Sequence, residues 1–272
     1  MSPLSGQLVL VGAGKMGGAM LDGWLAMGTP GAQISILDPF PSPQLEALVV
    51  GNGIALNPDM DQLDDAQVVL IAVKPQMMGE VLPSIAPLAK SKPVFLSVAA
   101  GTTIAQFENA FGADASIVRA MPNTPAAVGR GITAICPNKN CANAQVELAD
   151  TLLQAIGQVV KVDDEGLMDA VTAVSGSGPA YVFHLIECMA KAGEAQGLPA
   201  ETAMQLARAT VAGAGELVHQ SDLTAETLRK NVTSPGGTTA AALKVLMASD
   251  GMPKLLGEAI AAAARRGREL AG

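Results

Sequence analysis

Residue types that build metal sites and disulfide frameworks are scarce in this sequence of 272 residues. There are two histidines, His184 and His219, and three cysteines, Cys136, Cys141 and Cys188, with no CxxC pair among them. Structural zinc sites take their ligands from clustered Cys and His, and a disulfide framework needs paired cysteines. We therefore expect neither a metal site nor a disulfide scaffold, and we expect each cysteine to be a small buried hydrophobe.

Aromatic and charged residues are also scarce, at 3% and 15% of the chain. The 17 Lys and Arg residues are outnumbered by 25 Asp and Glu residues, which gives a net charge of −8. Surfaces that bind nucleic acids need clustered cations to contact the phosphates. We therefore expect no nucleic-acid partner.

Long apolar runs are missing as well. A membrane helix needs about 18 uncharged apolar residues, and the longest candidate, 182–190, contains His184 and Glu187. The first residues carry no basic segment of the kind that opens a signal peptide, and they run directly into a strand pattern. We therefore expect a cytoplasmic protein with no membrane partner.

What is present first is a regular alternation of short apolar runs and helix-like stretches. The runs at 7–11, 34–38, 68–73, 94–99 and 115–120 are nearly continuous in aliphatic residues, as expected for strands covered on both faces. Helical segments are predicted at 15–27, 42–50, 75–89 and 102–110, followed by strands at 131–135 and 158–162 on either side of a helix at 139–156. This alternation predicts a Rossmann-type, doubly wound parallel sheet.

The pattern changes after Asp164, and no further strand is predicted. Ala-rich stretches at helical spacing cover 165–193, 200–220, 224–231 and 236–270. We therefore expect a dinucleotide-binding domain at 1–164 and an all-helical domain at 165–272. The segment 168–191 is apolar on all sides, which in so small a domain predicts burial against a second copy of the chain.

A glycine-rich turn follows the first predicted strand. Gly12, Gly14 and Gly17 form a G-x-G-x-x-G motif that opens the helix at 15–27. In a dinucleotide site the three glycines serve the tight turn, the approach of the pyrophosphate and the close packing of helix on strand. The pyrophosphate would bind to free amides at the start of the helix. The alternative is a glycine-rich turn that binds no ligand.

Asp38 closes the second predicted strand, about 20 residues beyond the glycines, where an acidic side chain can bind the ribose 2′-hydroxyl of NADH. No Arg or Lys follows in 39–44 to neutralise a 2′-phosphate. Both observations favour NADH over NADPH. The alternative is that Asp38 only caps the next turn.

Two more strand ends lie where ligands bind in open α/β sheets. Val73 is placed to contact the adenosine, Pro75 to start the next helix, and Lys74 either to contact the ligand or to lie free on the surface. The small residues Ala99 and Ala100 would let the nicotinamide half approach closely.

The helical half contains two unusual clusters. Ser175–Pro179 interrupts a helical pattern with residues that cost about 1 kcal/mol (Gly) and about 3 kcal/mol (Pro) relative to Ala. Ser234–Thr239 brings exposed amides and hydroxyls to the start of a helix, a place that binds anions such as a carboxylate. A simple capping loop is the alternative for the second cluster.

Five motifs together resemble the pyrroline-5-carboxylate reductase family, in matching order from end to end of the chain. They are GAGKMG at 12–17, AVKPQ at 72–76, MPNTP at 121–125, SGSGPAY at 175–181 and VTSPGGTT at 232–239. The resemblance implies reduction of 1-pyrroline-5-carboxylate to L-proline with NADPH or NADH, the last step of proline biosynthesis. It also implies a homodimer through the helical domain, and dimers that build into a larger ring.

The same resemblance implies site residues. Positions matching cofactor contacts are Gly12, Ala13, Gly14, Lys15, Met16, Gly17, Asp38, Ala72, Val73, Lys74, Pro75, Ala99 and Ala100. Positions matching the substrate loop are Ser234, Gly236, Gly237, Thr238 and Thr239, with Thr239 as the catalytic hydroxyl. The chain departs from the family at 221–225, where Asp222 is the nearest equivalent of an acidic contact, and at Asp38, which many relatives that prefer NADPH lack.

Two other functions fit part of the pattern. A β-hydroxyacid dehydrogenase needs a lysine base soon after its glycine-rich helix, but none occurs here before Lys191. A dinucleotide sensor without catalysis would leave the loop Ser234–Thr239 without a purpose. A cyclic imine is readily protonated and then electrophilic, so its reduction depends mainly on orientation. That chemistry agrees with a chain in which we find no Ser-His-Asp, Cys-His or metal set.

Overall fold

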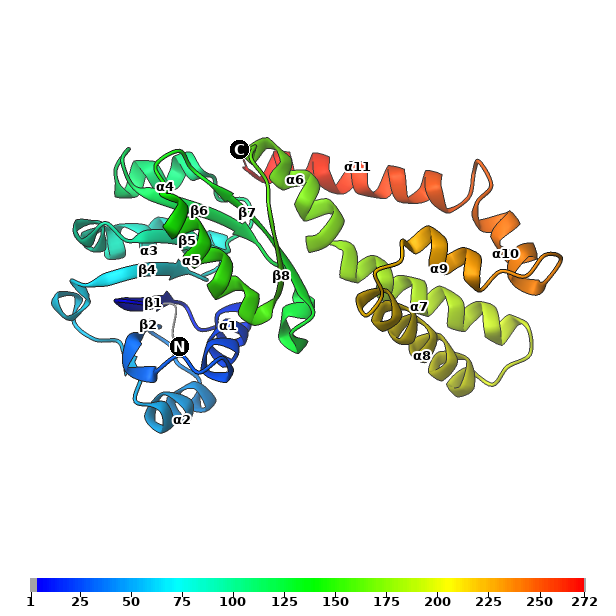
Figure 1. Cartoon of the computed structure of the whole chain (residues 1–272), viewed down its shortest axis with the longest axis horizontal. Helices are drawn as coiled ribbons and strands as arrows, with labels where there is room; N and C mark the ends of the chain where they lie inside the picture. Colours follow the sequence, from blue (N-terminus) through cyan, green and yellow to red (C-terminus); the bar gives the residue numbers. More distant parts are fainter. Residues whose placement is uncertain (1–3, 272) are drawn as a thin grey trace. The chain divides into compact units, whose positions relative to one another are not determined.

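The computed structural model describes residues 4–271, which form two compact units (Figure 1). The first unit contains the residues up to Gly176 together with those from Ala264 onward, and the second contains Ser177–Ala263. The α/β sheet lies entirely in the first unit, and the second unit is all-helical. The predicted fold class is therefore confirmed, while the domain boundary at residue 164 stays a prediction.

The first unit is built on one eight-stranded sheet in the order β3-β2-β1-β4-β5-β6-β7-β8. Its strands are β1 (Gln7–Val11), β2 (Ile34–Leu37), β3 (Ala55–Leu56), β4 (Ala66–Ile71), β5 (Val94–Ser97), β6 (Ser116–Met121), β7 (Gly131–Pro137) and β8 (Gly157–Lys161). Neighbouring strands are parallel except β6 and β7. Strand order reverses beside β1, at the switch point where open α/β sheets bind ligands.

Helices cover both faces of this sheet, and each face has its own core (Figure 1). Helices α1 (Lys15–Ala26), α2 (Pro43–Asn52) and α5 (Asn143–Leu153) pack on one face. Helices α3 (Met78–Ile85) and α4 (Ile104–Phe111) pack on the other. Because the strands β1, β2, β4, β5 and β6 are buried from both sides, their apolar runs are nearly continuous, as the sequence predicted.

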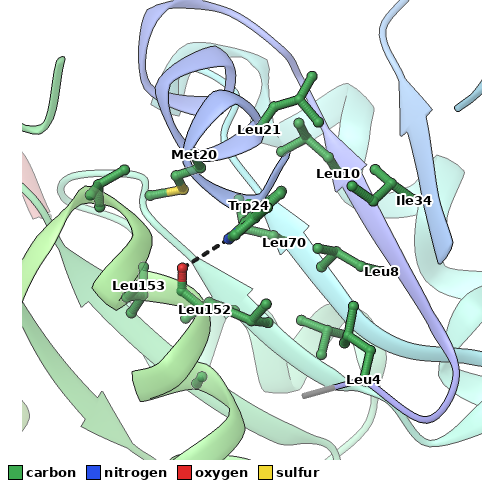
Figure 2. Packing of buried hydrophobic residues seen from close by; sticks show 14 of the residues in the cluster. Leu4, Leu8, Leu10, Met20, Leu21, Trp24, Ile34, Leu70, Leu152 and Leu153 are labelled. Atoms are coloured by element: carbon green, nitrogen blue, oxygen red, sulfur yellow. Dashed lines mark hydrogen bonds between the residues drawn. The ribbon is translucent and has the colours of Figure 1, made fainter. Parts of the chain in front are cut away.

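Trp24 joins two of the covering helices. It lies on α1 with 1% of its surface exposed, among Leu8, Leu10 and Met20 (Figure 2). Its indole Nε1–H donates to the Leu152 carbonyl of α5 at 2.8 Å. The chain's single tryptophan therefore fixes α1, the helix that follows the glycine loop, against both the sheet and α5.

Prolines divide the helix predicted at 75–89. The structure has a 3-10 turn at Pro75–Met77, then α3, then a 3-10 segment at Ala86–Ser91. Pro83 lies inside α3 and Pro87 at the start of the following 3-10 segment. Because Pro87 has no backbone N–H to donate to the Pro83 carbonyl four residues earlier, the α-helical ladder ends there and the chain continues as a 3-10 segment.

The helix predicted at 165–193 is interrupted as well. A 3-10 turn (Glu165–Leu167) and α6 (Met168–Val171) lead into a π-helical turn, Thr172–Gly176, before α7 (Gly178–Ala195). Pro179 has no N–H to donate to the Ser175 carbonyl four residues earlier. That carbonyl instead accepts from Asn123 Nδ2 at 3.2 Å, while Asn123 Oδ1 accepts from the Ile132 N–H at 3.0 Å. The expectation of one apolar helix over 168–191 was therefore wrong.

The second unit contains α7, α8 (Ala200–His219), α9 (Ala225–Asn231), α10 (Thr238–Leu246) and most of α11 (Met252–Ala271). The helix predicted at 236–270 is thus two helices. The small buried cluster between α7 and α8 consists of Ala190, Ala203 and Ala207. Many large apolar side chains of this unit are exposed in the single chain, among them Phe183 and Val245. Among residues 4–271, no helix has the length and apolar character needed to cross a membrane.

The Asn123 contact leads to a stability prediction. Asn123→Asp keeps an acceptor for the Ile132 N–H but replaces the donor to the Ser175 carbonyl with a second acceptor. We expect the free energy of unfolding to fall by about 1 kcal/mol, the low end of the cost of leaving a polar group unsatisfied, because the contact is partly buried. Urea denaturation followed by circular dichroism measures it.

The matched control is Asn52→Asp. Asn52 makes a similar bond, from Nδ2 to the Leu48 carbonyl, but on the exposed surface of α2. Its change should stay within about 0.5 kcal/mol. Equal losses of unfolding free energy in the two variants would show that the Asn123 contact stabilises the fold no more than the exposed Asn52 contact.

Candidate functional site

The glycine loop lies between β1 and α1, and glycine serves a different purpose at each of its three positions. Gly12 has a φ of +87°, and a Cβ there would lie 2.7 Å from Val73 Cγ1. A Cβ on Gly17 would come within 2.2 Å of the Gly12 carbonyl oxygen. A Cβ on Gly14 would meet nothing within 4 Å, so this glycine faces open space. Gly12 and Gly17 are required by packing, and Gly14 leaves room for a ligand to approach the backbone.

The start of α1 is suited to an anion. Its N-cap is Gly14, which provides no side-chain cap, so no side chain satisfies the first-turn amides of the helix. Lys15 is exposed and Met16 is half-buried at this end. Open space at Gly14 beside uncapped amides fits the pyrophosphate of a dinucleotide.

Asp38 lies directly beside this loop. Its Oδ2 accepts from the Ala13 N–H at 2.9 Å, and its Oδ1 accepts from the Phe40 N–H at 3.0 Å. The carboxylate thus caps the next turn and also contacts the glycine loop, while its contact with a ribose hydroxyl stays a prediction. Its half-buried side chain retains lone pairs that can accept from a ribose hydroxyl.

Asn57 holds Asp38 in place and was missed from the sequence. Its Oδ1 accepts from the Asp38 N–H and its Nδ2 donates to the Asp38 carbonyl, both at 2.8 Å. Asn57 has a φ of +49°, a conformation that Asn tolerates better than most residues. The Asn-Pro pair at 57–58 was the available signal, since this dipeptide marks turns.

The ends of β4 and β5 complete the same edge of the sheet. Ala72 N–H donates to the Val11 carbonyl at 2.8 Å, and a Cβ on Gly17 would lie 3.3 Å from the Ala72 Cβ. The β4 end, with Val73 beside Gly12, therefore touches the glycine loop directly. Lys74 and Pro75 are exposed just beyond it.

Beyond β5, Ala99 is buried and Ala100 is exposed. A cavity of about 970 Å³ opens there, between α3 and α4. Pro75, Ala100 and Thr102 line its side toward the strand ends, and Asp169 and Thr172 add polar groups from α6 and the π-helical turn. The predicted cofactor residues of the first unit are thus brought to one edge of the sheet.

The predicted substrate loop belongs to the second unit. Gly236 has a φ of +73°, and the Gly237 N–H donates to the Ser234 carbonyl at 3.1 Å, which closes a turn. Gly237 is the N-cap of α10 and provides no side-chain cap. The amides of Thr238 and Thr239 in the first turn therefore point beyond the helix without an intrahelical partner. Thr239 is half-buried and Thr238 is exposed, so the two hydroxyls differ in environment.

Asp222 and the three cysteines belong to other segments of the chain. Asp222 is exposed in the turn between α8 and α9. Cys136 is buried, Cys141 is partly buried and Cys188 is exposed, so the expectation of burial was wrong for Cys188. Burial raises the pKa of the Cys136 and Cys141 thiols. No group of three potential metal ligands occurs within the described part of the chain.

Two family models match the chain. A model described as pyrroline-5-carboxylate reductase dimerisation matches residues 165–270. A second, described as NADP oxidoreductase, coenzyme F420-dependent, matches residues 7–101. The matches cover the glycine loop with its neighbouring strand ends and the helical region with the loop Ser234–Thr239.

Known proteins resemble the chain over nearly its whole length. A pyrroline-5-carboxylate reductase from Pseudomonas aeruginosa is 40% identical over 97% of both chains, and one from Synechocystis is 40% identical over 98% of this chain and 99% of its own. A solved structure of a pyrroline-5-carboxylate reductase from Coxiella burnetii superposes with a TM-score of 0.92 at 33% identity, covering 98% of this chain and 99% of that one.

A pyrroline carboxylate reductase from Plasmodium falciparum, solved with NADP bound, superposes with a TM-score of 0.79 at 29% identity over 98% of this chain and 99% of its own. Sequence, fold and the two family models agree with the motifs at the glycine loop and before α10. The chain belongs to the pyrroline-5-carboxylate reductase family.

Proposed function

We propose that this chain reduces 1-pyrroline-5-carboxylate to L-proline with NAD(P)H, as the last step of proline biosynthesis. The observation that carries the proposal is 40% identity, over 97% of both chains, to a protein of that name. The site agrees with it, because a dinucleotide cradle and an anion-binding helix start occur in one chain that has no metal-ligand group among its described residues.

An assay that follows NADH at 340 nm tests this function. We expect absorbance to fall when pyrroline-5-carboxylate is added and proline to accumulate in equal amount. β-Hydroxyacids with NAD⁺ should give no absorbance change, which separates this function from that of a dehydrogenase. Tight NADH binding without turnover of pyrroline-5-carboxylate would instead support a dinucleotide sensor.

The dinucleotide would be held by the loop Gly12–Gly17, by Asp38, and by the strand ends Ala72–Pro75 and Ala99–Ala100. Uncapped amides at the start of α1 would bind its pyrophosphate, and open space at Gly14 would admit it. When bound, the reduced nicotinamide supplies the hydride. The small side chains of Ala99 and Ala100 keep the backbone beyond β5 accessible to the nicotinamide half.

Asp38 would select NADH. Its carboxylate is turned toward the glycine loop by the Ala13 and Phe40 N–H groups, and Asn57 fixes the backbone behind it. A carboxylate in this place accepts hydrogen bonds from a ribose 2′-hydroxyl and repels a 2′-phosphate. No Arg or Lys follows in 39–44 to offset that repulsion.

The cofactor prediction uses two variants. The unmodified protein should show the higher kcat/KM with NADH, and Asp38→Ser should narrow or reverse the preference by roughly tenfold or more, as expected for loss of a hydrogen bond to a charged group. Asp38→Asn is the matched control for the glycine loop, because its amide oxygen can still accept from the Ala13 N–H.

Steady-state kinetics with NADH and with NADPH measure the cofactor preference of each protein. A strong NADPH preference in the unmodified protein would contradict the role of Asp38.

The loop Ser234–Thr239 would bind the substrate. The uncapped amides at the start of α10, with the helix dipole behind them, suit the carboxylate of a pyrroline carboxylate. The Thr239 hydroxyl would hydrogen-bond the ring nitrogen or help to deliver its proton. Since the protonated imine is already electrophilic, the loop would contribute to catalysis mainly by orienting the ring.

The matched pair Thr239→Val and Thr238→Val tests the catalytic hydroxyl. Valine keeps the shape of threonine and removes its donor. We expect Thr239→Val to lower kcat/KM by roughly tenfold to a thousandfold, the scale of one lost positioned donor or proton-transfer group. The more exposed Thr238 should matter less, and the affinity for the dinucleotide, measured by fluorescence, should hardly change. Full activity of Thr239→Val would remove the hydroxyl from the mechanism.

The helical unit would assemble the protein as a homodimer, with dimers building into a larger ring. The family model that matches 165–270 is a dimerisation model, and large apolar side chains of this unit are exposed in the single chain. Light scattering at micromolar concentration should therefore give at least twice the chain mass of 27.5 kDa. A folded, active monomer would contradict the assembly.

A further inference from the structure

An ion pair between a buried arginine and a half-buried glutamate lies outside the motifs described above. Arg119 is on β6, and its side chain is only 8% exposed. Its Nη1 donates to Glu165 Oε1 at 2.7 Å, and the Glu165 side chain is 30% exposed. Glu165 opens the 3-10 turn that leads into α6. The pair therefore joins the sheet to the segment that ends in the π-helical turn.

The same carboxylate oxygen holds a second donor. The Ile104 N–H, at the start of α4, donates to Glu165 Oε1 at 2.9 Å. The N-cap of α4 is Thr103, whose hydroxyl accepts from the Gln106 N–H while the Gln106 side chain accepts from the Thr103 N–H. This capping box leaves the Ile104 amide to be satisfied from elsewhere, and Glu165 satisfies it.

Apolar side chains lie beside the pair, and two further carboxylates, Asp163 and Asp164, directly precede Glu165 in the chain. Cys136 lies opposite Arg119 on β7, in a cluster with Ala134 and Met168. The pKa of the Cys136 thiol is raised by burial first and by the Glu165 charge second, with Arg119 opposing. Burying the Arg119 charge is costly, and an apolar pair of similar volume often gives equal or greater stability. An apolar side chain at position 165 would, however, leave the Ile104 N–H without its acceptor.

The segment 98–103 lies between two anchors. On one side the Val98 N–H donates to the Ile71 carbonyl of β4 at 3.0 Å, and on the other Glu165 holds the Ile104 N–H. Gly101, with a φ of +78°, turns the chain between them. Ala99 and Ala100, which the proposed function assigns to the nicotinamide half, lie within this segment.

We infer that Glu165, held in place by Arg119, is a positioning residue that fixes the loop 98–103 for the nicotinamide half of the dinucleotide. The inference rests on the proposed function for the identity of the cofactor. Arg119 orients the carboxylate, and the carboxylate fixes the start of α4. The adenosine half, bound at Asp38 and the glycine loop, does not depend on this pair.

A double variant separates positioning from stability. Arg119→Met with Glu165→Leu removes the buried Arg119 charge and its half-buried partner and keeps the volume apolar. That gain offsets the lost hydrogen bond of the Ile104 N–H, so the melting temperature should stay close to that of the unmodified protein. Because the Ile104 N–H loses its acceptor, the loop 98–103 is no longer held at that end, and we expect the affinity for NADH to fall by about tenfold, the scale of one lost hydrogen bond to a charged group. Affinity for ADP-ribose, which lacks the nicotinamide, should stay unchanged. Calorimetric titration with both ligands gives the ratio of the NADH affinity to the ADP-ribose affinity.

Two controls sharpen the test. Glu165→Gln keeps a side-chain oxygen for the Ile104 N–H, so its NADH to ADP-ribose affinity ratio should remain close to that of the unmodified protein. Lys161→Met with Asp163→Leu applies the same kind of change to an exposed pair and should alter neither affinity. Unchanged NADH affinity in the Arg119–Glu165 double variant, or equal losses for both ligands, would overturn the inference.

These readouts need no substrate. If the unmodified protein binds NADH but leaves pyrroline-5-carboxylate unreduced, the proposed reaction fails and a selective loss of NADH affinity in the double variant still supports the positioning role. If the unmodified protein reduces pyrroline-5-carboxylate and the double variant binds NADH normally, the proposed reaction stands and the positioning role fails.

Discussion

The contact of backbone with backbone at the glycine loop is the constraint on which the first unit depends. Because a side chain at Gly17 would collide with the Gly12 carbonyl, α1 can lie against the sheet only with glycine there. That placement brings Trp24 within reach of the Leu152 carbonyl and aims the uncapped start of α1 at the open space beside Gly14. The packing of α1 and the open space for a ligand thus both follow from the close approach of the Gly17 backbone to the Gly12 carbonyl.

A second set of contacts joins residues 165–176, the segment that leads into α7, to the rest of the first unit. The Ser175 carbonyl, left without its helical donor by Pro179, is satisfied by Asn123, and Glu165 links Arg119 to the start of α4. Two motifs that are 50 residues apart in the sequence, MPNTP and SGSGPAY, therefore meet at one hydrogen bond. Interrupted helices with π-helical turns often occur at functional sites, and this one lies beside the cavity near Ala100.

Much of the first unit could be predicted from the sequence, because its strands are buried on both faces and its glycine motif has a fixed place after the first strand. The two-residue β3, the end of α3 before Pro87, and the π-helical turn before Pro179 could not, since each depends on single backbone donors rather than on periodicity. Asn57 and Glu165 were missed because their partners, Asp38 and Ile104, are 19 and 61 residues away.

The central claim is that hydride passes from the dinucleotide to the imine carbon of pyrroline-5-carboxylate. Mass spectrometry of the proline formed with NADH deuterated at both C4 positions measures this transfer directly. The account predicts one deuterium per proline on Cδ, the ring carbon next to nitrogen that does not carry the carboxylate, and no deuterium on Cδ when unlabelled NADH is used in deuterated water. Proline without that deuterium, or oxidation of the cofactor without proline, would contradict it.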